Sequence, residues 1–99
     1  MVLAVLGLNH KTVSVDIREK FSISEESARE GLLHLSEQTG IKEAVVLSTC
    51  NRTEIYAVLK DEEDKEELYR FFLTLSGNSK AEKEYFFFYT GTECIRHLF

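Results

Sequence analysis

The 99-residue sequence has no proline or tryptophan, only two cysteines and no long hydrophobic run. Its longest apolar stretch, Val2–Leu8, is far shorter than the roughly 18–20 residues that span a bilayer. The start of the chain also lacks the charge and the small-residue cleavage site of a signal peptide. Two cysteines cannot form a disulfide framework, so the expected setting is reducing and cytoplasmic.

Positive charge is scarce as well, because 12 Lys and Arg against 17 Asp and Glu give a formal net charge of −5. This balance argues against a domain that holds nucleic acid by bulk charge. The acidity is uneven, however: residues 60–67 contain six acids and two bases, residues 9–20 sum to +1, and residues 49–54 sum to zero. We therefore expect the acids on a solvated helical surface, away from the polar segments described below.

The hydrophobic pattern predicts a small α+β domain. Apolar runs predict strands, and apolar residues at helical spacing predict helices. In chain order we expect a strand at 2–8, a helix within 22–40, strands at 44–47 and 55–59, a helix over 61–77 and a strand at 85–89. This is the ferredoxin-like βαββαβ order, which predicts a four-stranded antiparallel sheet with two helices on one face. A third helix is expected to begin at Gly91, and its nearness to the last residue suggests a fragment of a longer protein.

The first expected helix carries start and stop signals. Ser22 and Ser24 are both suitable N-caps, and Ser22 with Glu25 matches a capping box. Gly40 is expected to end the helix. Its inner face should consist of Ala28, Leu32, Leu33 and Leu35. The preceding residues, 9–20, are polar and predict a long loop, a feature that is often functional in small domains.

A polar turn at residues 48–54 joins two of the expected strands. Cys50 lies in this turn, and Arg52 two residues later favours its thiolate by proximity of charge. A thiolate beside a fixed cation is a nucleophile, and the neighbouring hydroxyl and amide groups can bind a polar substrate or an oxyanion. A buried, unreactive cysteine is the alternative, and the local sequence leaves both open.

The remaining cysteine and histidines favour structural roles when taken alone. Cys94 lies on the expected C-terminal helix, where a thiol usually packs, and His34 lies on a helix flank. No paired cysteine spacing suggests a metal site. The glycines nowhere approach the G-x-G-x-x-G spacing, so no dinucleotide cradle is expected within these residues.

Three sequence blocks carry a resemblance to a known family. They are residues 7–12 with 16–21, residues 47–56 and residues 93–99. In this order and spacing they resemble the N-terminal catalytic domain of glutamyl-tRNA reductase, over essentially the whole chain. The resemblance implies NADPH-dependent reduction of glutamyl-tRNA to glutamate-1-semialdehyde through a cysteine thioester. This reaction is the first step of five-carbon tetrapyrrole (porphyrin) biosynthesis.

The resemblance also implies roles for particular residues. Cys50 matches the nucleophile, and His97 matches a histidine that acts at the site by proton transfer or by substrate positioning. Thr49, Asn51 and Arg52 match the substrate-contacting segment. The Arg52 guanidinium is suited to a two-pronged contact with a carboxylate.

The resemblance also implies which residues support the site, which cofactor is used and which partners are bound. His10 and Glu54 are expected to support the site: Glu54 can orient Arg52, with a plain surface carboxylate as the alternative. NADPH would bind a second domain, and a third would form a homodimer, both outside residues 1–99. The glutamate-1-semialdehyde aminomutase would receive the product.

Two other classes share the expected fold. An RNA-binding module would display aromatics on its central strands, but the expected strand over residues 53–59 has only Tyr56. A small-metabolite regulatory domain would need no reactive thiol, so an ordinary Cys50 pKa of about 8.5 would favour it.

Overall fold

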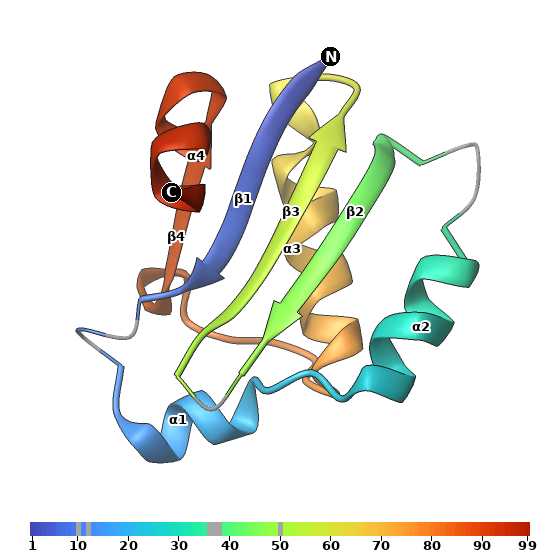
Figure 1. The fold of residues 1–99 in the computed structure, drawn as a ribbon. Coiled ribbons are helices and arrows are strands. Elements are labelled where there is room, and N and C mark those ends of the chain that lie inside the picture. Colours follow the sequence, from blue (N-terminus) through green and yellow to red (C-terminus); the bar gives the residue numbers. More distant parts are fainter. Residues whose placement is uncertain (10, 12, 36–38, 50) are drawn as a thin grey trace.

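The structure, a computed structural model, describes residues 1–9, 11, 13–35, 39–49 and 51–99 (Figure 1). Two residues singled out above, His10 and Cys50, lie outside the described residues. The elements in chain order are β1 (Val2–Leu8), α1 (Val15–Lys20), α2 (Glu25–Leu33), β2 (Ile41–Ser48), β3 (Thr53–Leu59), the 3-10 turn η1 (Glu62–Asp64), α3 (Lys65–Leu75), the 3-10 turn η2 (Lys83–Tyr85), β4 (Phe86–Thr90) and α4 (Gly91–Leu98).

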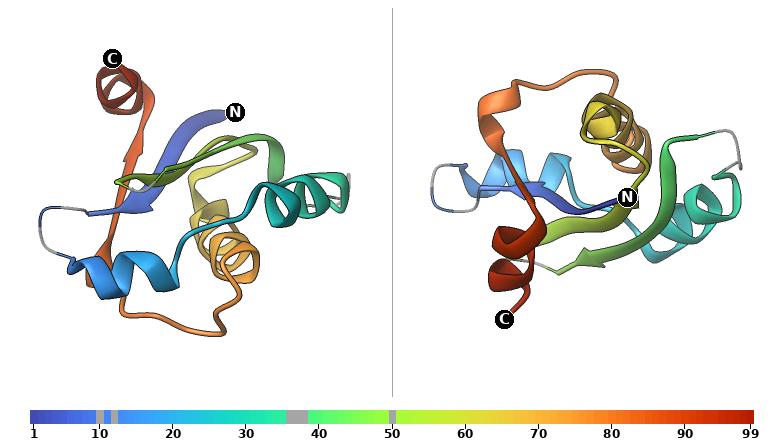
Figure 2. Two further views of the ribbon diagram at one scale, coloured as in Figure 1. Left: turned by 60° about the horizontal axis from the view of Figure 1, so that its bottom comes forward. Right: turned by 90° about the horizontal axis from the view of Figure 1, so that it is seen from above.

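Within the described residues the strands form one four-stranded sheet in the order β2-β3-β1-β4. Every neighbouring pair is antiparallel, which confirms the predicted ferredoxin-like α+β arrangement. The helices α2 and α3 lie against one face of the sheet, and α4 lies against the other (Figure 2). None of the helices in the described part of the chain is long and apolar enough to cross a membrane.

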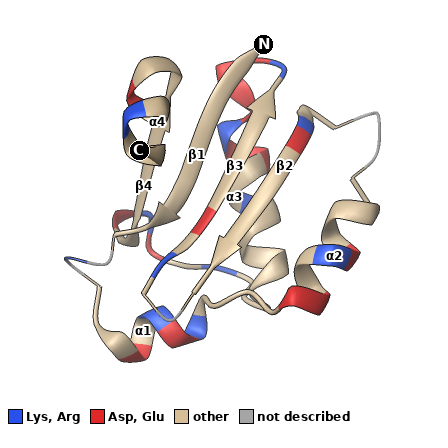
Figure 3. Cartoon of the chain, in the orientation of Figure 1, with Lys and Arg blue, Asp and Glu red and all other residues tan. Residues whose placement is uncertain are grey.

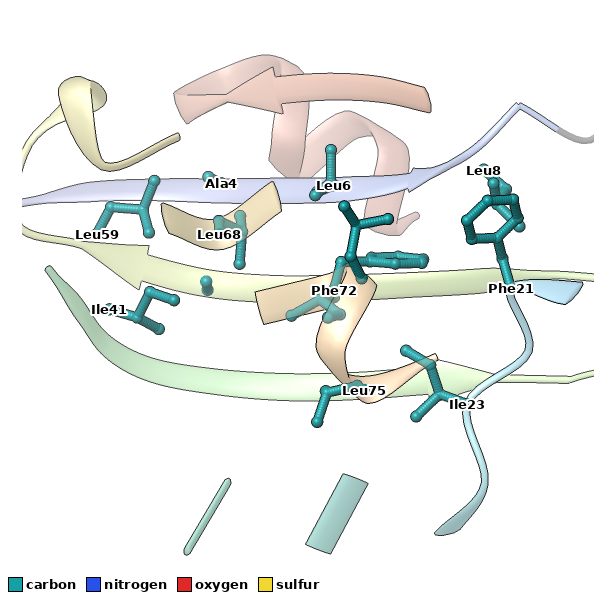
Figure 4. Close-up of a cluster of buried hydrophobic side chains, with 13 residues drawn as sticks. Ala4, Leu6, Leu8, Phe21, Ile23, Ile41, Leu59, Leu68, Phe72 and Leu75 are labelled. Atoms are coloured by element: carbon teal, nitrogen blue, oxygen red, sulfur yellow. The ribbon is translucent and has the colours of Figure 1, made fainter. Parts of the chain in front are cut away.

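The main core fills the face of the sheet under α3 (Figure 4). Leu6 of β1 lies opposite Ile55 of β3, and both side chains are buried. Phe72 of α3 is completely buried, and its ring meets the ring of Phe86 edge-on at a centroid distance of 5.1 Å. Because side chains alternate along a strand, the residues next to these face α4 on the other side.

That second face carries Gly7, Glu54 and Phe87 side by side. Gly7 of β1 is paired with Glu54 of β3 and with Phe87 of β4. The aromatic side chains of β4 therefore pack on both faces of the sheet, because Phe86 enters the main core while Phe87 faces α4.

The segment before α2 differs from the expectation of a long loop. Residues 15–20 form the short helix α1, whose N-cap Ser14 accepts a hydrogen bond from the backbone N–H of Ile17 at 3.4 Å. Six residues with few apolar positions do not complete a helical stripe, so the pattern could not reveal this helix. In Figure 1, α1 lies beside the turn between β2 and β3.

The helix α2 is shorter than predicted. Its N-cap is Ser24, which accepts from the backbone N–H of Ser27 at 3.0 Å, whereas the Ser22 hydroxyl donates to the Glu19 carbonyl. The capping box expected at Ser22 is therefore wrong. The helix ends at Leu33, well before Gly40, and the Leu33 side chain is 77% exposed instead of joining the inner face.

The acidic residues lie where their clustering predicted. Asp and Glu side chains gather on η1 and the first turn of α3, and again at the start of α2 (Figure 3). Most of these residues are exposed. The net negative charge is therefore mainly a property of solvated helical surfaces, as expected.

Candidate functional site

A buried carboxylate organises the candidate site. The Glu54 residue on β3 is only 2% exposed. Arg52 approaches it with two nitrogens: Nη2 donates to Oε1 at 2.7 Å and Nε donates to Oε2 at 3.3 Å. The Tyr56 hydroxyl also donates to Oε1, at 3.1 Å. Of the two interpretations of Glu54, the structure therefore favours the one in which it orients Arg52, and not the plain surface carboxylate.

His97 reaches the same carboxylate from α4. Its Nε2 lies 2.8 Å from Oε2 of Glu54. The imidazole ring packs against Phe87 and Tyr89, with centroid distances of 4.6 and 5.5 Å. A carboxylate can only accept hydrogen bonds, so Nε2 must carry the proton in this pair. In the neutral ring this leaves Nδ1 as the nitrogen able to accept a proton.

The hydrogen bonds and charges of this network shift the pKa values of Glu54, Arg52 and Tyr56. Burial opposes ionisation of Glu54, but hydrogen bonds from His97 and Arg52 outweigh it and hold the pKa of Glu54 below its ordinary value. The hydrogen bond to Glu54 raises the pKa of Arg52 further above its ordinary value. Burial, followed by the charge of Glu54, raises the pKa of Tyr56 to about 12. Glu54 is thus an anion with a cationic partner, and Tyr56 is a neutral donor, at neutral pH.

Gly7 makes this arrangement sterically possible. A Cβ atom at this position would lie 2.7 Å from Cζ of Phe87 and 2.8 Å from Cγ of Glu54. Both distances are far below van der Waals contact. The absence of a side chain on β1 therefore allows Glu54 and Phe87 to approach each other across the central strand.

The turn between β2 and β3 is built around the Thr49 hydroxyl. Its Oγ1 accepts from the backbone N–H groups of Asn51 and Arg52 at 3.3 and 3.0 Å. The Thr49 N–H donates to the Arg52 carbonyl at 2.6 Å. These bonds close the turn on either side of Cys50, the predicted nucleophile, which lies outside the described residues.

A cavity of about 340 Å³ opens beside this turn. It is lined in part by Thr49, Asn51 and Arg52 from the turn and by Val15, Arg18 and Glu19 from α1. The structure thus brings the three predicted substrate-contacting residues to one cavity, with His97 joined to them through Glu54. The prediction missed Arg18, whose only signal was its place within block 16–21 of the resemblance.

The other candidates do not line this cavity. Cys94 is 1% exposed, and burial raises the pKa of its thiol, so its expected packing role is confirmed. His34 is exposed near the end of α2. A larger cavity of about 460 Å³ lies between α2 and α3, and its lining includes none of the predicted site residues. Among the described residues, no group of three or more His, Cys, Asp or Glu could hold a metal ion.

The central strands β1 and β3 do not form a surface for base stacking. Tyr56 is the one aromatic residue on these two strands. It is half-buried and its hydroxyl is bound to Glu54. RNA-recognition modules need exposed aromatic rings at such positions, so this geometry argues against that class.

Comparison with known proteins decides the family. The model of the family described as glutamyl-tRNAGlu reductase, N-terminal domain, matches residues 6–99. The chain belongs to this family. Glutamyl-tRNA reductase of Desulforudis audaxviator is 41% identical over 100% of the chain, and that of Synechocystis is 44% identical over 99% of it.

A solved structure agrees with this membership. Glutamyl-tRNA reductase from Methanopyrus kandleri superposes with a TM-score of 0.67 and 27% identity, over 97% of this chain and 21% of that chain. The chain spans only 22% and 23% of the length of the two glutamyl-tRNA reductases named above. The similarity therefore concerns the N-terminal domain of these longer reductases.

Proposed function

We propose that residues 1–99 provide the nucleophile and the substrate site of a glutamyl-tRNA reductase. The observation that carries this proposal is the buried Glu54, which holds Arg52 at the cavity and His97 on α4 within a chain of this family. The substrate would be glutamyl-tRNA, and the pathway would be tetrapyrrole biosynthesis.

The first chemical step is acyl transfer to Cys50. The thiolate attacks the carbonyl carbon of the ester that joins the α-carboxyl group of glutamate to the 3′ end of the tRNA. A carbon–sulfur bond forms, the carbon–oxygen bond breaks, and the tRNA leaves with the bonding electron pair and takes up a proton. A thiolate is both a good nucleophile and a good leaving group, so the thioester stays reactive towards reduction.

Arg52 and His97 have separate tasks in this scheme. Glu54 holds two nitrogens of the Arg52 guanidinium, which orients the remaining N–H groups for a substrate carboxylate. His97 offers Nδ1, which can take the thiol proton and return it to the departing tRNA oxygen. Thr49 acts mainly through the backbone, because its hydroxyl closes the turn that carries the nucleophile.

NADPH would reduce the thioester to the aldehyde, but these residues do not fit a dinucleotide. In the described sheet every pair of hydrogen-bonded strands is antiparallel, and the sequence has no G-x-G-x-x-G turn after a strand. Gly7, the glycine nearest the site, is enclosed by Phe87 and Glu54. We therefore assign NADPH binding, homodimer formation and contact with the aminomutase to parts of the enzyme outside residues 1–99. The expected cytoplasmic setting would keep Cys50 reduced.

Mass spectrometry of the intact protein mixed with glutamyl-tRNA tests the proposal. We expect a glutamyl adduct on Cys50, no adduct in Cys50→Ser, and an unchanged adduct in Cys94→Ser because that thiol is buried. The absence of an adduct in the unmodified protein, or an equal adduct in Cys50→Ser, would show that the proposed acyl transfer is wrong.

A further inference from the structure

Within the described residues, Arg18 is a cation without an ion-pair partner at the edge of the candidate cavity. It lies in the last turn of α1, is half-buried and lines the cavity of about 340 Å³. Within the described part of the chain, its buried Nε atom has no hydrogen-bond partner, and no ion pair involves its guanidinium. Buried polar atoms normally have hydrogen-bond partners. An unpaired guanidinium nitrogen beside a cavity therefore suggests that a bound ligand supplies the missing partner.

The guanidinium of Arg52, in contrast, has hydrogen-bond partners within the protein. Its Nε and Nη2 are bound to Glu54, so its charge is largely compensated by the protein. Glu19 is the carboxylate on the cavity wall, against the two cations Arg18 and Arg52. Because Arg52 is already paired with Glu54, Arg18 is the cation of this wall with which no described residue forms an ion pair.

The cavity wall also has an apolar part. Leu8 and Val15 contribute aliphatic side chains beside the two guanidinium groups. A short aliphatic chain that ends in a carboxylate matches this combination, because its methylene groups meet apolar side chains and its charge meets a cation. The glutamyl side chain has this chemistry.

We propose that Arg18 is a specificity-determining residue that binds the side-chain carboxylate of the glutamyl group together with Arg52. This inference rests on the proposed function. No partner in the described part of the chain restrains the Arg18 guanidinium, so it can turn its Nε edge towards the ligand without breaking a contact there. A glutamine side chain would leave the guanidinium unpaired, so Arg18 selects the acid over the amide.

Binding of two small esters to the intact protein tests this selectivity. L-glutamate 1-methyl ester keeps the carboxylate, and L-glutamine 1-methyl ester replaces it by an amide. We expect the protein to prefer the glutamate ester, and Arg18→Gln to weaken that binding about 10- to 100-fold with little change for the glutamine ester. Arg18→Lys should restore part of the preference, since it keeps the charge but loses the fork.

Two controls separate recognition from folding and from phosphate binding. Arg29→Gln removes an exposed cation of α2 and should change neither affinity nor melting temperature. Adenosine 5′-monophosphate, which mimics the phosphate near the tRNA 3′ end, should bind Arg18→Gln and the unmodified protein alike. If Arg18→Gln weakened binding of the nucleotide but not of the glutamate ester, the assignment of Arg18 to a carboxylate would be overturned. So would equal losses for both esters with a lowered melting temperature, which would indicate a structural role.

The adduct on Cys50 distinguishes this inference from the proposed function. If the unmodified protein forms the adduct but its ester selectivity is absent, or is the same in Arg18→Gln, the role of Arg18 is wrong and the acyl transfer stands. If Arg18→Gln loses selectivity while no protein forms the adduct, the carboxylate site stands and the proposed acyl transfer is wrong.

Discussion

The Nε2 atom of His97 lies 2.8 Å from Oε2 of Glu54, across 43 residues of sequence. This contact joins α4 to the central strand β3 at the carboxylate that also orients Arg52. Formation of the candidate site therefore requires α4 to dock on the sheet. A substitution that displaces α4 would also alter the position of Arg52, because both are bound to Glu54.

Glu54→Gln is expected to impair both stability and acyl transfer. The amide loses the charge that pairs with Arg52 and His97 in a buried position, so we expect the free energy of unfolding to fall by about 1–3 kcal/mol. Chemical denaturation and the rate of Cys50 adduct formation measure the two effects. Glu66→Gln is a matched control, because the ion pair of Glu66 with Lys83 is exposed and should contribute little. Equal behaviour of the two variants would contradict the central role of Glu54.

Acid should weaken the fold through the same carboxylate. The pKa of folded Glu54 lies below its ordinary value of 4.5, so the ionised form favours folding. This contribution is complete above the ordinary pKa and is lost as the pH falls through the lowered value. Unfolding curves recorded at several pH values below 4.5 should therefore show a smaller acid-dependent loss in Glu54→Gln than in the unmodified protein. Parallel losses in both proteins would contradict the direction of this shift.

Gly7→Ala should disturb the site from the opposite strand. The new methyl group would meet Phe87 and Glu54 at 2.7 and 2.8 Å, so one of them must move. We expect a loss of about 1–3 kcal/mol in stability and slower adduct formation. Adding Phe87→Leu should recover part of the stability by opening space on one side, which thermal denaturation of the double variant would show. A Gly7→Ala protein with unchanged stability and adduct rate would mean that the close packing is not required.

Cys94 should resist alkylation in the folded protein. Its thiol is buried and burial raises its pKa, and both effects suppress the reactive thiolate. Iodoacetamide followed by peptide mapping should label Cys94 only after denaturant is added, whereas Cys50 is predicted to react without it. Rapid labelling of Cys94 in the native protein would show that α4 opens readily.

Much of the fold could be predicted because its signals are local. Apolar runs and helical spacing depend on near neighbours in the chain, and they identified all four strands, α3 and the start of α4. The same reasoning missed α1, since six residues are too few for a period, and placed the end of α2 too late. Packing of Cys94 was also predictable from its position in a helix.

The sequence by itself determined the polar turn and the resemblance to a family. Together these two features identified Arg52, His97 and their neighbours as candidate site residues. Only the tertiary structure decided how these residues act together. Glu54 lies on the face of β3 away from the main core, where the pattern allowed a surface carboxylate, but α4 covers it. Likewise Arg18 lines the same cavity as Thr49 and Arg52 only because α1 lies beside the β2–β3 turn. Burial and pairing of a charge depend on segments distant in sequence, and no local pattern encodes such contacts.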